Sequence, residues 1–333
     1  MIDLNLPLID LHRHLDGSVR LATILDLGRR YNLPLPAWTL EELRPFVQVS
    51  GPQPGILAFF VRFQWMTGVM VNYDAIRRIA YENIEDASIE SIDYIELRFS
   101  PWFMAETHGL DPAGVVEAVV DGVAAGQRDL KVNANLIGIL SRTYGPENAR
   151  KELDALLTQR QRIVGLDLAG DEAHFPGDLF VDHFRRARDA GWHITVHAGE
   201  VVGPQSVWQA LRELGAERIG HAVHAPEDPV LIEYLALHRI GIESNLTSNV
   251  QTSTVSDYPS HPLRAFLEKG ILATINTDDP GISAIDLAYE YNTAAPAAGL
   301  GPSQIRQAQL NALAVAFLSE AEKEELVDRK KKK

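Results

Sequence analysis

The sequence contains no cysteine, and this absence excludes several kinds of site at once. A chain without thiols has no disulfide framework, no cysteine-ligated zinc ribbon and no cysteine nucleophile. Any metal ion in this protein must therefore be bound by histidine and carboxylate side chains. The missing thiols do not identify the cellular compartment.

Basic residues are also in short supply, with 31 Lys and Arg against 45 Asp and Glu, which gives a formal net charge of -14. This charge repels phosphate backbones and anionic lipids, so nucleic acid and membrane surfaces are poor candidate partners. No apolar run approaches the roughly 20 residues that span a bilayer, and the first residues lack the basic segment of a secretory signal. We therefore expect a cytoplasmic protein.

The length of 333 residues is about twice that of a typical domain, but α/β barrels commonly reach this size as one unit. With 46% hydrophobic residues, the chain has enough apolar material for one large core. We expect a single domain over residues 1–333. The basic end, Lys330–Lys333, is expected to be solvated and disordered, or an addition to the native sequence.

Apolar, β-rich segments recur eight times, and helix-length amphipathic stretches separate most of them. This alternation is typical of parallel strands, and eight such strands close a (β/α)8 TIM barrel. The expected strands are Pro7–His14, Tyr94–Ser100, Asn133–Arg142, Gly165–Asp171, His193–Gly199, Arg218–Val223, Gly241–Ser248 and Ala273–Asp279. The expected helices include Asp111–Asp129, Asn148–Gln159, Leu179–Ala190, Pro204–Leu214, Pro229–His238 and Pro262–Lys269.

The spacing between the first two strands is much longer than the others. Residues 15–93 are expected to insert extra helices after strand 1, and they include an aromatic run with Phe59, Phe60 and Phe63. Ordinary packing of extra helices is the simpler interpretation of this run. A mobile lid over the barrel mouth is the alternative.

Histidine and aspartate residues gather at the carboxyl ends of the expected strands, which form the active-site face of a TIM barrel. The first strand ends with His12 and His14, and the two-residue period of a strand directs both imidazoles to the same side. The fifth strand ends with His197, and Asp278 lies at the end of the eighth. A buried histidine or a turn aspartate is unremarkable alone, but four ligand-type residues on one rim favour a metal site.

Three imidazoles and one carboxylate suit zinc, with water completing the coordination shell. The fourth strand, Gly165–Asp171, contains no Lys or His that could bridge a second ion. We therefore expect one Zn²⁺ per chain.

Three other titratable residues follow the same strands and are candidate catalytic groups. Glu200 lies three residues beyond His197 and could carry a proton to the substrate. His221 could orient or deprotonate a zinc-bound water, and Asp279 could do the same or bind substrate. Because zinc lowers the pKa of its water to about 7, hydroxide is available at neutral pH. An acid partner then needs a pKa raised by a desolvated pocket.

Six motifs together resemble the adenosine deaminase family, in the expected order and over nearly the whole chain. They are Leu11-His12-Arg13-His14-Leu15-Asp16-Gly17, Ser100-Pro101, Asp167-Leu168-Ala169-Gly170-Asp171-Glu172, His197-Ala198-Gly199-Glu200, Ile219-Gly220-His221 and Asn276-Thr277-Asp278-Asp279-Pro280. The resemblance implies zinc-dependent hydrolysis of adenosine, and of 2′-deoxyadenosine, to the inosine product and ammonia. It also implies that the zinc ligands are His12, His14, His197 and Asp278.

The same resemblance assigns the chemistry and the substrate contacts. Glu200 would protonate N1 of the purine as hydroxide adds to C6, and His221 would assist the attacking water. Asp279 would help to position that water and hydrogen-bond N7, and Gly170 would contact N3 through its backbone. Asp16 would hold the ribose 5′-hydroxyl, and the ligand His14 would also border the substrate.

Relatives that deaminate free adenine tend to carry Glu in place of Asp16, so the resemblance favours the nucleoside. By the same comparison, the insert corresponds to the region that covers the nucleoside pocket, which favours the lid interpretation of its phenylalanines. Two positions depart from the family pattern: Ala222 stands where Gly is common, and Asn245 where Cys is frequent. A methyl group beside His221 could tilt its ring and lower turnover, which an Ala222→Gly variant would test.

Other functions remain possible at this point. The same barrel and metal could serve another aminopurine, such as adenine or a modified adenosine, or the hydrolysis of an ester or cyclic amide. A non-catalytic nucleoside-binding protein is the alternative from a different class, although a binder has no need of a proton carrier such as Glu200. The sequence does not indicate the oligomeric state.

Overall fold

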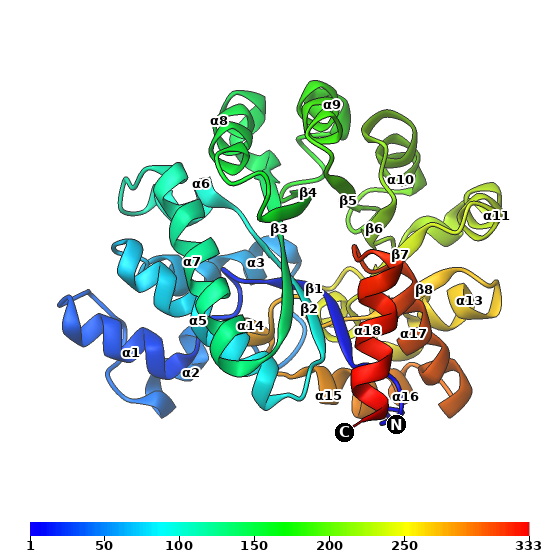
Figure 1. The fold of residues 1–333 in the computed structure, drawn as a ribbon, viewed down its shortest axis with the longest axis horizontal. Helices are drawn as coiled ribbons and strands as arrows, with labels where there is room; N and C mark the ends of the chain where they lie inside the picture. The colour runs from blue at the N-terminus through cyan, green and yellow to red at the C-terminus, as the bar shows by residue number, and fades with distance from the viewer. Residues whose placement is uncertain (333) are drawn as a thin grey trace.

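The computed structural model describes residues 1–332 and contains one sheet of eight strands in the order β1 to β8. Each strand pairs with the next in parallel, and helices surround the strands (Figure 1). The predicted TIM barrel is confirmed. The strands are β1 Ile9–His14, β2 Tyr94–Phe99, β3 Asn133–Ser141, β4 Ile163–Ala169, β5 His193–Ala198, β6 Arg218–His221, β7 Gly241–Ser244 and β8 Leu272–Ile275.

The barrel closes between β1 and the residues that follow β8. The backbone amide of Leu11 donates to the side-chain oxygen of Asn276 (3.0 Å). This side chain therefore takes the place of a backbone carbonyl in the hydrogen bonding between the two segments. Above it, His14 N donates to Asp278 O and Asp278 N donates to His12 O, each at 2.8 Å. This closure brings the carboxylate of Asp278 beside the two histidines of β1.

The seventh strand is shorter than predicted. It ends at Ser244, and the helix α12, Leu246–Gln251, occupies residues that the prediction assigned to the strand. A buried carboxylate explains the helix start, because Glu290 Oε1 accepts a hydrogen bond from Thr247 N at 3.2 Å. The first amides of a helix have no partner within the helix and need such an acceptor.

The outer helices follow the predicted segments, with differences of a few residues at their ends. Asp111 caps α7 by accepting from Ala113 N, and Asp228 caps α11 by accepting from Val230 N. The segment predicted as Pro204–Leu214 begins as α10 and continues as a π-helical turn from Ala210. The main helices are α7 Pro112–Leu130, α8 Gly145–Leu157, α9 Val181–Asp189, α10 Pro204–Gln209, α11 Pro229–Leu237, α13 Leu263–Glu268, α17 Pro302–Val315 and α18 Glu320–Lys331.

The prediction of a disordered basic end is wrong for Lys330 and Lys331, which complete α18, whereas Lys333 lies outside the described residues. Lysines suit the last turn of a helix because they oppose its dipole. Lys330 also forms an ion pair with Asp93 at 2.6 Å. In Figure 1 the N-terminus is drawn beside the end of α18. Arg306 of α17 forms an ion pair with Asp3.

The insert between β1 and β2 is helical, as predicted. Its helices are α1 Leu21–Arg30, α2 Leu40–Val47, α3 Ile56–Phe60, α4 Gln64–Thr67 and α5 Tyr73–Ile89, with a 3-10 turn at Val61–Phe63. α5 packs along α7, so the insert contacts the outer helical layer. In Figure 1 the insert occupies one side of the barrel.

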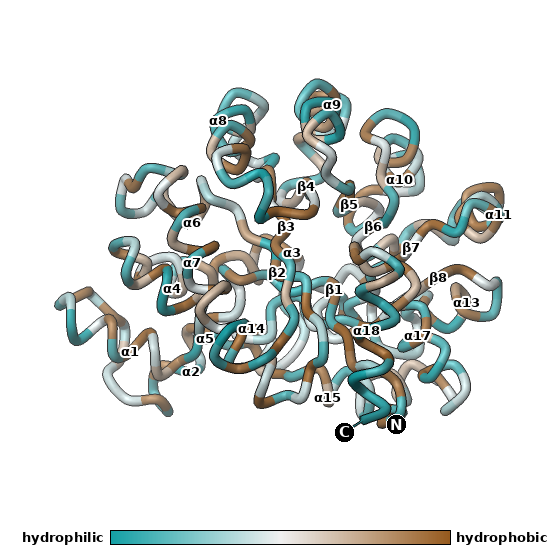
Figure 2. Tube along the Cα trace, in the orientation of Figure 1, coloured by the Kyte–Doolittle hydropathy of each residue, from teal (hydrophilic) through white to brown (hydrophobic). Residues whose placement is uncertain are grey.

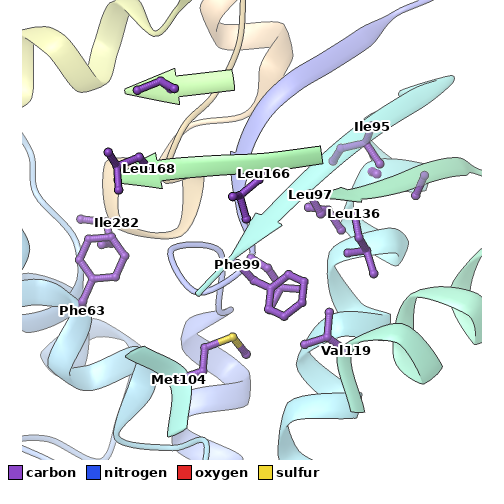
Figure 3. Packing of buried hydrophobic residues seen from close by; sticks show 14 of the residues in the cluster. Phe63, Ile95, Leu97, Phe99, Met104, Val119, Leu136, Leu166, Leu168 and Ile282 are labelled. Atoms are coloured by element: carbon purple, nitrogen blue, oxygen red, sulfur yellow. The ribbon is translucent and has the colours of Figure 1, made fainter. Parts of the chain in front are cut away.

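A continuous hydrophobic cluster joins the insert to the barrel. Leu166 and Leu168 of β4, Phe99 of β2 and Phe63 of the insert belong to this cluster, and Figure 3 shows them in the same region. Figure 2 shows hydrophilic residues along much of the outer helical layer. Between residues 1 and 332, no helix has both the length and the apolar character needed to span a membrane.

Candidate active site

Five side chains of the types that can bind a metal ion converge at the carboxyl ends of the strands. Donor atoms of His12, His197, His221 and Asp278 all lie within 4.8 Å of one another. The remaining predicted ligand, His14, adjoins them, with its Nε2 atom 3.2 Å from His197 Nε2 and 3.3 Å from Asp278 Oδ1. The four predicted ligands are therefore brought together, and His221, predicted as a catalytic group, lies in the same cluster.

The donor atoms of this cluster fit a metal ion. His12 Nε2 is buried and has no hydrogen-bond partner among the described residues, although it lies 3.2 Å from Asp278 Oδ1. Burial lowers the pKa of His197 to about 3, which keeps its imidazole neutral, as a metal ligand requires. Burial opposes the protonation of His14, but the charges of Asp279, Asp278 and Asp16 outweigh it and raise the pKa of His14 to about 9, so this ring must lose a proton to bind a metal. Three deprotonated imidazoles with one carboxylate form a donor set that suits zinc.

Buried carboxylates orient two of the histidines from behind. Glu243 Oε2 lies 2.7 Å from His12 Nδ1, and Asp167 Oδ2 lies 2.9 Å from His197 Nδ1. A carboxylate accepts the Nδ1–H, so the Nε2 lone pair of each ring faces the centre of the cluster. The tautomers of His12 and His197 are thus those of metal ligands.

Arg98 of β2 connects these two carboxylates, donating to Asp167 Oδ2 and Glu243 Oε2 at 2.8 Å each. Burial opposes the ionisation of both acids, but His197 and Arg98 beside Asp167, and Arg98 and Arg218 beside Glu243, outweigh it. The pKa of each carboxyl therefore stays below its usual range. Both acids are ionised and accept hydrogen bonds at neutral pH.

His221 has a different environment. Asn249 Nδ2 lies 3.0 Å from its Nδ1 atom and Asn245 Nδ2 lies 3.3 Å from the same atom, so amide nitrogens stand where a carboxylate stands behind His12. Glu200 Oε1 is 3.7 Å from this nitrogen. Burial lowers the pKa of His221. Asn245, one of the departures from the family pattern, is thus a direct neighbour of this histidine.

Three non-glycine residues at this site have left-handed backbone conformations: His221 (φ 64°), Ala222 (φ 54°) and Asp278 (φ 63°). Such conformations cost about 1 kcal/mol or more per residue and often occur at functional sites. The value at Ala222 gives a physical reason for glycine in the family pattern, since glycine adopts this conformation freely. The effect of this methyl group on turnover stays a prediction.

The carboxylate of Glu172 holds the loop that carries Glu200 in place. Glu172 accepts hydrogen bonds from four successive backbone amides after β5. They are those of Gly199 (2.6 Å), Glu200 (3.1 Å), Val201 (2.8 Å) and Val202 (3.0 Å). Burial, with the nearby charges of Asp278 and Glu172, raises the pKa of Glu200 to about 8. Glu200 therefore carries a proton at neutral pH.

A cavity of about 190 Å³ opens above the donor cluster. Its polar wall includes Asp16, Glu200 and Asp279, and no Lys or Arg is among the described residues that line it. Its apolar wall includes the predicted lid residues Phe59, Phe60 and Phe63, together with Ile56, Phe103 and Ile139. One end of the pocket thus suits polar contacts and the other suits an apolar or aromatic group.

Asp279 presents an unpaired atom at this site. Its Oδ1 atom is buried without a hydrogen-bond partner among the described residues. A Cβ atom at position 17 would lie 1.7 Å from that oxygen, so Gly17 is required by the close approach of Asp279. Burial, together with the charge of Asp278, raises the pKa of Asp279 well above its usual range. The protonated acid can donate a hydrogen bond to a ligand.

The other three predicted substrate residues, His14, Asp16 and Gly170, also line the cavity. Asp16 Oδ2 accepts a hydrogen bond from Ser100 N at 3.2 Å, which fixes the carboxylate at the pocket wall. Gly170 has φ 110°, and a Cβ atom there would lie 2.5 Å from Thr143 Oγ1. A glycine at this position leaves the backbone open to a planar ligand.

Sequence reasoning gave no role to the residues that support the site. Arg98 and Glu243 lie within segments predicted as buried strands, and a charged residue in such a strand is itself a signal, because buried charges need partners. Asp167 and Glu172 lay within a quoted motif without an assigned role. No comparable signal distinguishes Asn249 or His261 from ordinary polar residues.

Comparisons with known proteins agree with this geometry. A family model described as Adenosine deaminase matches residues 7–333. A protein named adenosine deaminase from Klebsiella pneumoniae (strain 342) is 60% identical over 329 residues, which is 99% of each chain. The fold is similar to that of adenine deaminase from Arthrobacter aurescens, with a TM-score of 0.90, 24% identity and 98% of each chain covered. It is also similar to an amidohydrolase from Burkholderia ambifaria solved with bound Zn, with a TM-score of 0.87 and 25% identity over 99% of this chain and 94% of that one.

Proposed function

The chain belongs to the adenosine deaminase family, and from this premise we propose that it hydrolyses adenosine and 2′-deoxyadenosine at C6, releasing ammonia and the corresponding inosine. One observation carries the proposal: the carboxyl group of Glu200 lies beside a cluster of metal donors in one pocket, where burial raises its pKa. A nucleoside-binding protein without catalytic activity would need neither group.

The proposed cofactor is one zinc ion, held by His12, His14, His197 and Asp278. The contact of Asp278 Oδ1 with the Nε2 atoms of both β1 histidines (3.2 and 3.3 Å) supports this set, as do the carboxylates behind His12 and His197. The similar amidohydrolase solved with bound Zn also supports it. When bound, zinc lowers the pKa of its water to about 7 and so supplies hydroxide at neutral pH.

The protein's own residues would move the protons and orient the ring. Glu200 donates its proton to N1 of the purine, which makes C6 more electrophilic as the nucleophile approaches. His221 orients the attacking water, and Asp279 helps to position it and hydrogen-bonds N7. Water supplies the oxygen of inosine. One of its protons returns to the carboxylate of Glu200, and the other leaves with the exocyclic nitrogen as ammonia.

The remaining polar contacts hold the substrate. The backbone of Gly170 contacts N3 of the purine, Asp16 accepts a hydrogen bond from the ribose 5′-hydroxyl, and His14 borders the sugar. Phe59, Phe60 and Phe63 form a cover over the pocket, which excludes water from the reacting atoms.

The charge of the pocket favours a nucleoside over a nucleotide. Asp16 lies in the lining, where no Lys or Arg is among the described residues, so a 5′-phosphate would enter a pocket of carboxyl groups without a cation to balance its charge. A free base would leave Asp16 without its hydroxyl partner. Unpaired buried polar groups lower affinity, so adenine is expected to be a poor substrate.

A substrate panel tests this proposal. Purified protein is incubated with adenosine, 2′-deoxyadenosine, adenine, N6-methyladenosine and 5′-AMP, and the ultraviolet change and released ammonia are followed. We expect both unmodified nucleosides to exceed adenine and 5′-AMP in kcat/KM by about 100-fold or more. Fastest turnover of adenine or 5′-AMP would overturn the substrate proposal. No turnover of any compound by the zinc-loaded protein would overturn the enzymatic one.

A further inference from the structure

A series of buried hydrogen bonds leads from a backbone amide to the metal cluster through His261 and Asn249. We propose that these two side chains are positioning residues that fix the tautomer of His221, so that its Nε2 atom presents an N–H group to the cluster. The inference rests on the proposed function, because it assigns the manner in which His221 acts in that site.

The first hydrogen bond fixes the tautomer of His261. Its Nδ1 atom lies 3.1 Å from the backbone N of Leu263, and a backbone amide can only donate. Nδ1 therefore holds a lone pair, and the ring proton is on Nε2. His261 is buried, and burial lowers its pKa to about 3, in keeping with a neutral ring.

The second hydrogen bond fixes the orientation of the Asn249 amide. His261 Nε2 lies 3.2 Å from Asn249 Oδ1, so the ring N–H donates to the amide oxygen. The amide NH₂ group then faces the other way, and one of its hydrogens goes to Thr254 Oγ1 at 3.1 Å. The Thr254 hydroxyl can accept it, because its own hydrogen is directed to Asn249 O at 3.2 Å.

The third hydrogen bond fixes the tautomer of His221. The other amide hydrogen of Asn249 points to His221 Nδ1 at 3.0 Å, so this nitrogen must accept. A neutral His221 then carries its proton on Nε2, 3.9 Å from Asp278 Oδ2. Two other groups face Nδ1. Asn245 Nδ2, which is also an amide nitrogen, lies 3.3 Å from Nδ1 and 3.5 Å from Nε2, so it is nearer to Nδ1. Glu200 Oε1 lies 3.7 Å from Nδ1, beyond hydrogen-bond distance.

The resulting tautomer is opposite to that of the histidines backed by carboxylates. His12 and His197 direct Nε2 lone pairs into the cluster, whereas His221 directs an N–H there. A protonated nitrogen cannot bind a metal ion. His221 therefore stays free of the metal and donates a hydrogen bond to the oxygen that attacks C6. It stabilises negative charge on the nucleophile and does not remove its proton.

Nitrogen-15 NMR of histidine-labelled protein reads this tautomer directly, without reference to turnover. The His221 signals are identified by their loss in a His221→Gln variant, in both the metal-free and the zinc-loaded protein. We expect the Nε2–H tautomer in both forms. In Asn249→Asp, the carboxylate accepts from His221 Nδ1, so we expect the tautomer to reverse and kcat to fall about tenfold or more, with KM nearly unchanged.

Two variants at His261 show whether its hydrogen bond to Asn249 is what fixes the tautomer of His221. His261→Gln keeps a donor to Asn249 Oδ1 and should preserve the His221 tautomer and most of kcat. His261→Leu removes the donor, so both tautomers of His221 should appear and kcat should fall. His183, a half-buried histidine of α9 that hydrogen-bonds Pro146 O, supplies the control: His183→Leu should leave the His221 spectrum unchanged.

An Nδ1–H tautomer of His221 in the parent protein would overturn this inference, even if the Asn249 and His261 variants do not fold. An unchanged tautomer in Asn249→Asp would also overturn it. If the parent shows the Nε2–H tautomer but does not deaminate adenosine, the proposed function fails while the tautomer assignment stands. The two failures are therefore distinguishable.

Discussion

Asn249 Nδ2 lies 3.0 Å from Nδ1 of His221, in the place where a carboxylate oxygen of Glu243 lies 2.7 Å from Nδ1 of His12. An amide donor behind one ring and a carboxylate acceptor behind the other give the two imidazoles opposite tautomers. In the proposed mechanism, this contrast separates His12, which would bind the metal, from His221, which would act on the nucleophile, although both belong to the same cluster. The protein thus uses different groups behind its histidines to assign their roles.

The metal content of two variants shows whether His14 or His221 is the third histidine ligand, beside His12 and His197. We expect His221→Gln to retain about one zinc per chain, whereas His14→Gln should lose zinc affinity by about tenfold or more, because it removes a ligand. Elemental analysis after dialysis against a zinc buffer measures both. Zinc loss from the His221 variant with full retention in the His14 variant would show that the ligand assignment is wrong.

Replacement of the acid separates catalysis from binding. Glu200→Gln removes the proton donor but keeps the size of the side chain, so we expect kcat to fall by about 10² to 10⁴-fold while purine binding and zinc content persist. Calorimetric titration with a non-hydrolysable purine nucleoside measures binding. As a control, Glu147→Gln changes an exposed glutamate of α8 and should leave kcat unaltered. A Glu200 variant with parental turnover would exclude this residue as the acid.

The pH dependence of the rate follows from the raised pKa of Glu200. The acid works only when protonated, so activity should be retained at neutral pH and lost as pH rises through its pKa, which is about 8. A bound dication opposes the charge of Asp278 and places this loss at or below that pH. Glu172→Gln removes a charge that raises the pKa, so the loss should move to lower pH.

The kcat/KM profile from pH 5 to pH 10 measures both effects, since this ratio reports groups of the free enzyme. The Glu172 variant should also lose turnover at its optimum, because the amide cannot accept from all the backbone groups that the carboxylate holds. A profile that rises through pH 8 to pH 10, or one that does not respond to Glu172→Gln, contradicts this account of the acid.

The proposed cover is tested at Phe60. This half-buried ring lines the cavity and lies 6.1 Å from the ring of Phe63, so its removal should weaken substrate binding more than chemistry. We expect Phe60→Ala to raise KM about tenfold with a smaller change in kcat. Leu57, on the same helix, is 65% exposed and supplies the control. Equal effects of Phe60→Ala and Leu57→Ala on KM would contradict a cover role.

The fold could be predicted from the sequence because its signals are local. Each strand is a short apolar run, and each connection is long enough for a helix, so the barrel follows from their number. The end of β7 was predicted incorrectly because the start of α12 depends on Glu290, which lies 43 residues from Thr247 along the chain. A contact of this kind leaves no trace in a local pattern.

The proximity of the candidate ligands could be predicted because the ends of the strands share one rim of the barrel, so that residues distant in the sequence lie close together in space. The proposed tautomer of His221 could not be predicted from the sequence, because it depends on the directions of hydrogen bonds in α12 and in the segment before α13. Asn249 lies in α12, and His261 lies two residues before the start of α13. Only the folded chain brings these two polar side chains into line with the cluster.

Zinc titration of the metal-free protein tests the central claim most directly. The protein is stripped with a chelator, returned to chelator-free buffer and titrated with Zn²⁺, while adenosine deamination is followed by ultraviolet absorbance. The account predicts no turnover without metal and a linear recovery that ends at about one zinc per chain. Full turnover by protein that elemental analysis shows to be metal-free would contradict it, as would a recovery that requires two zinc ions.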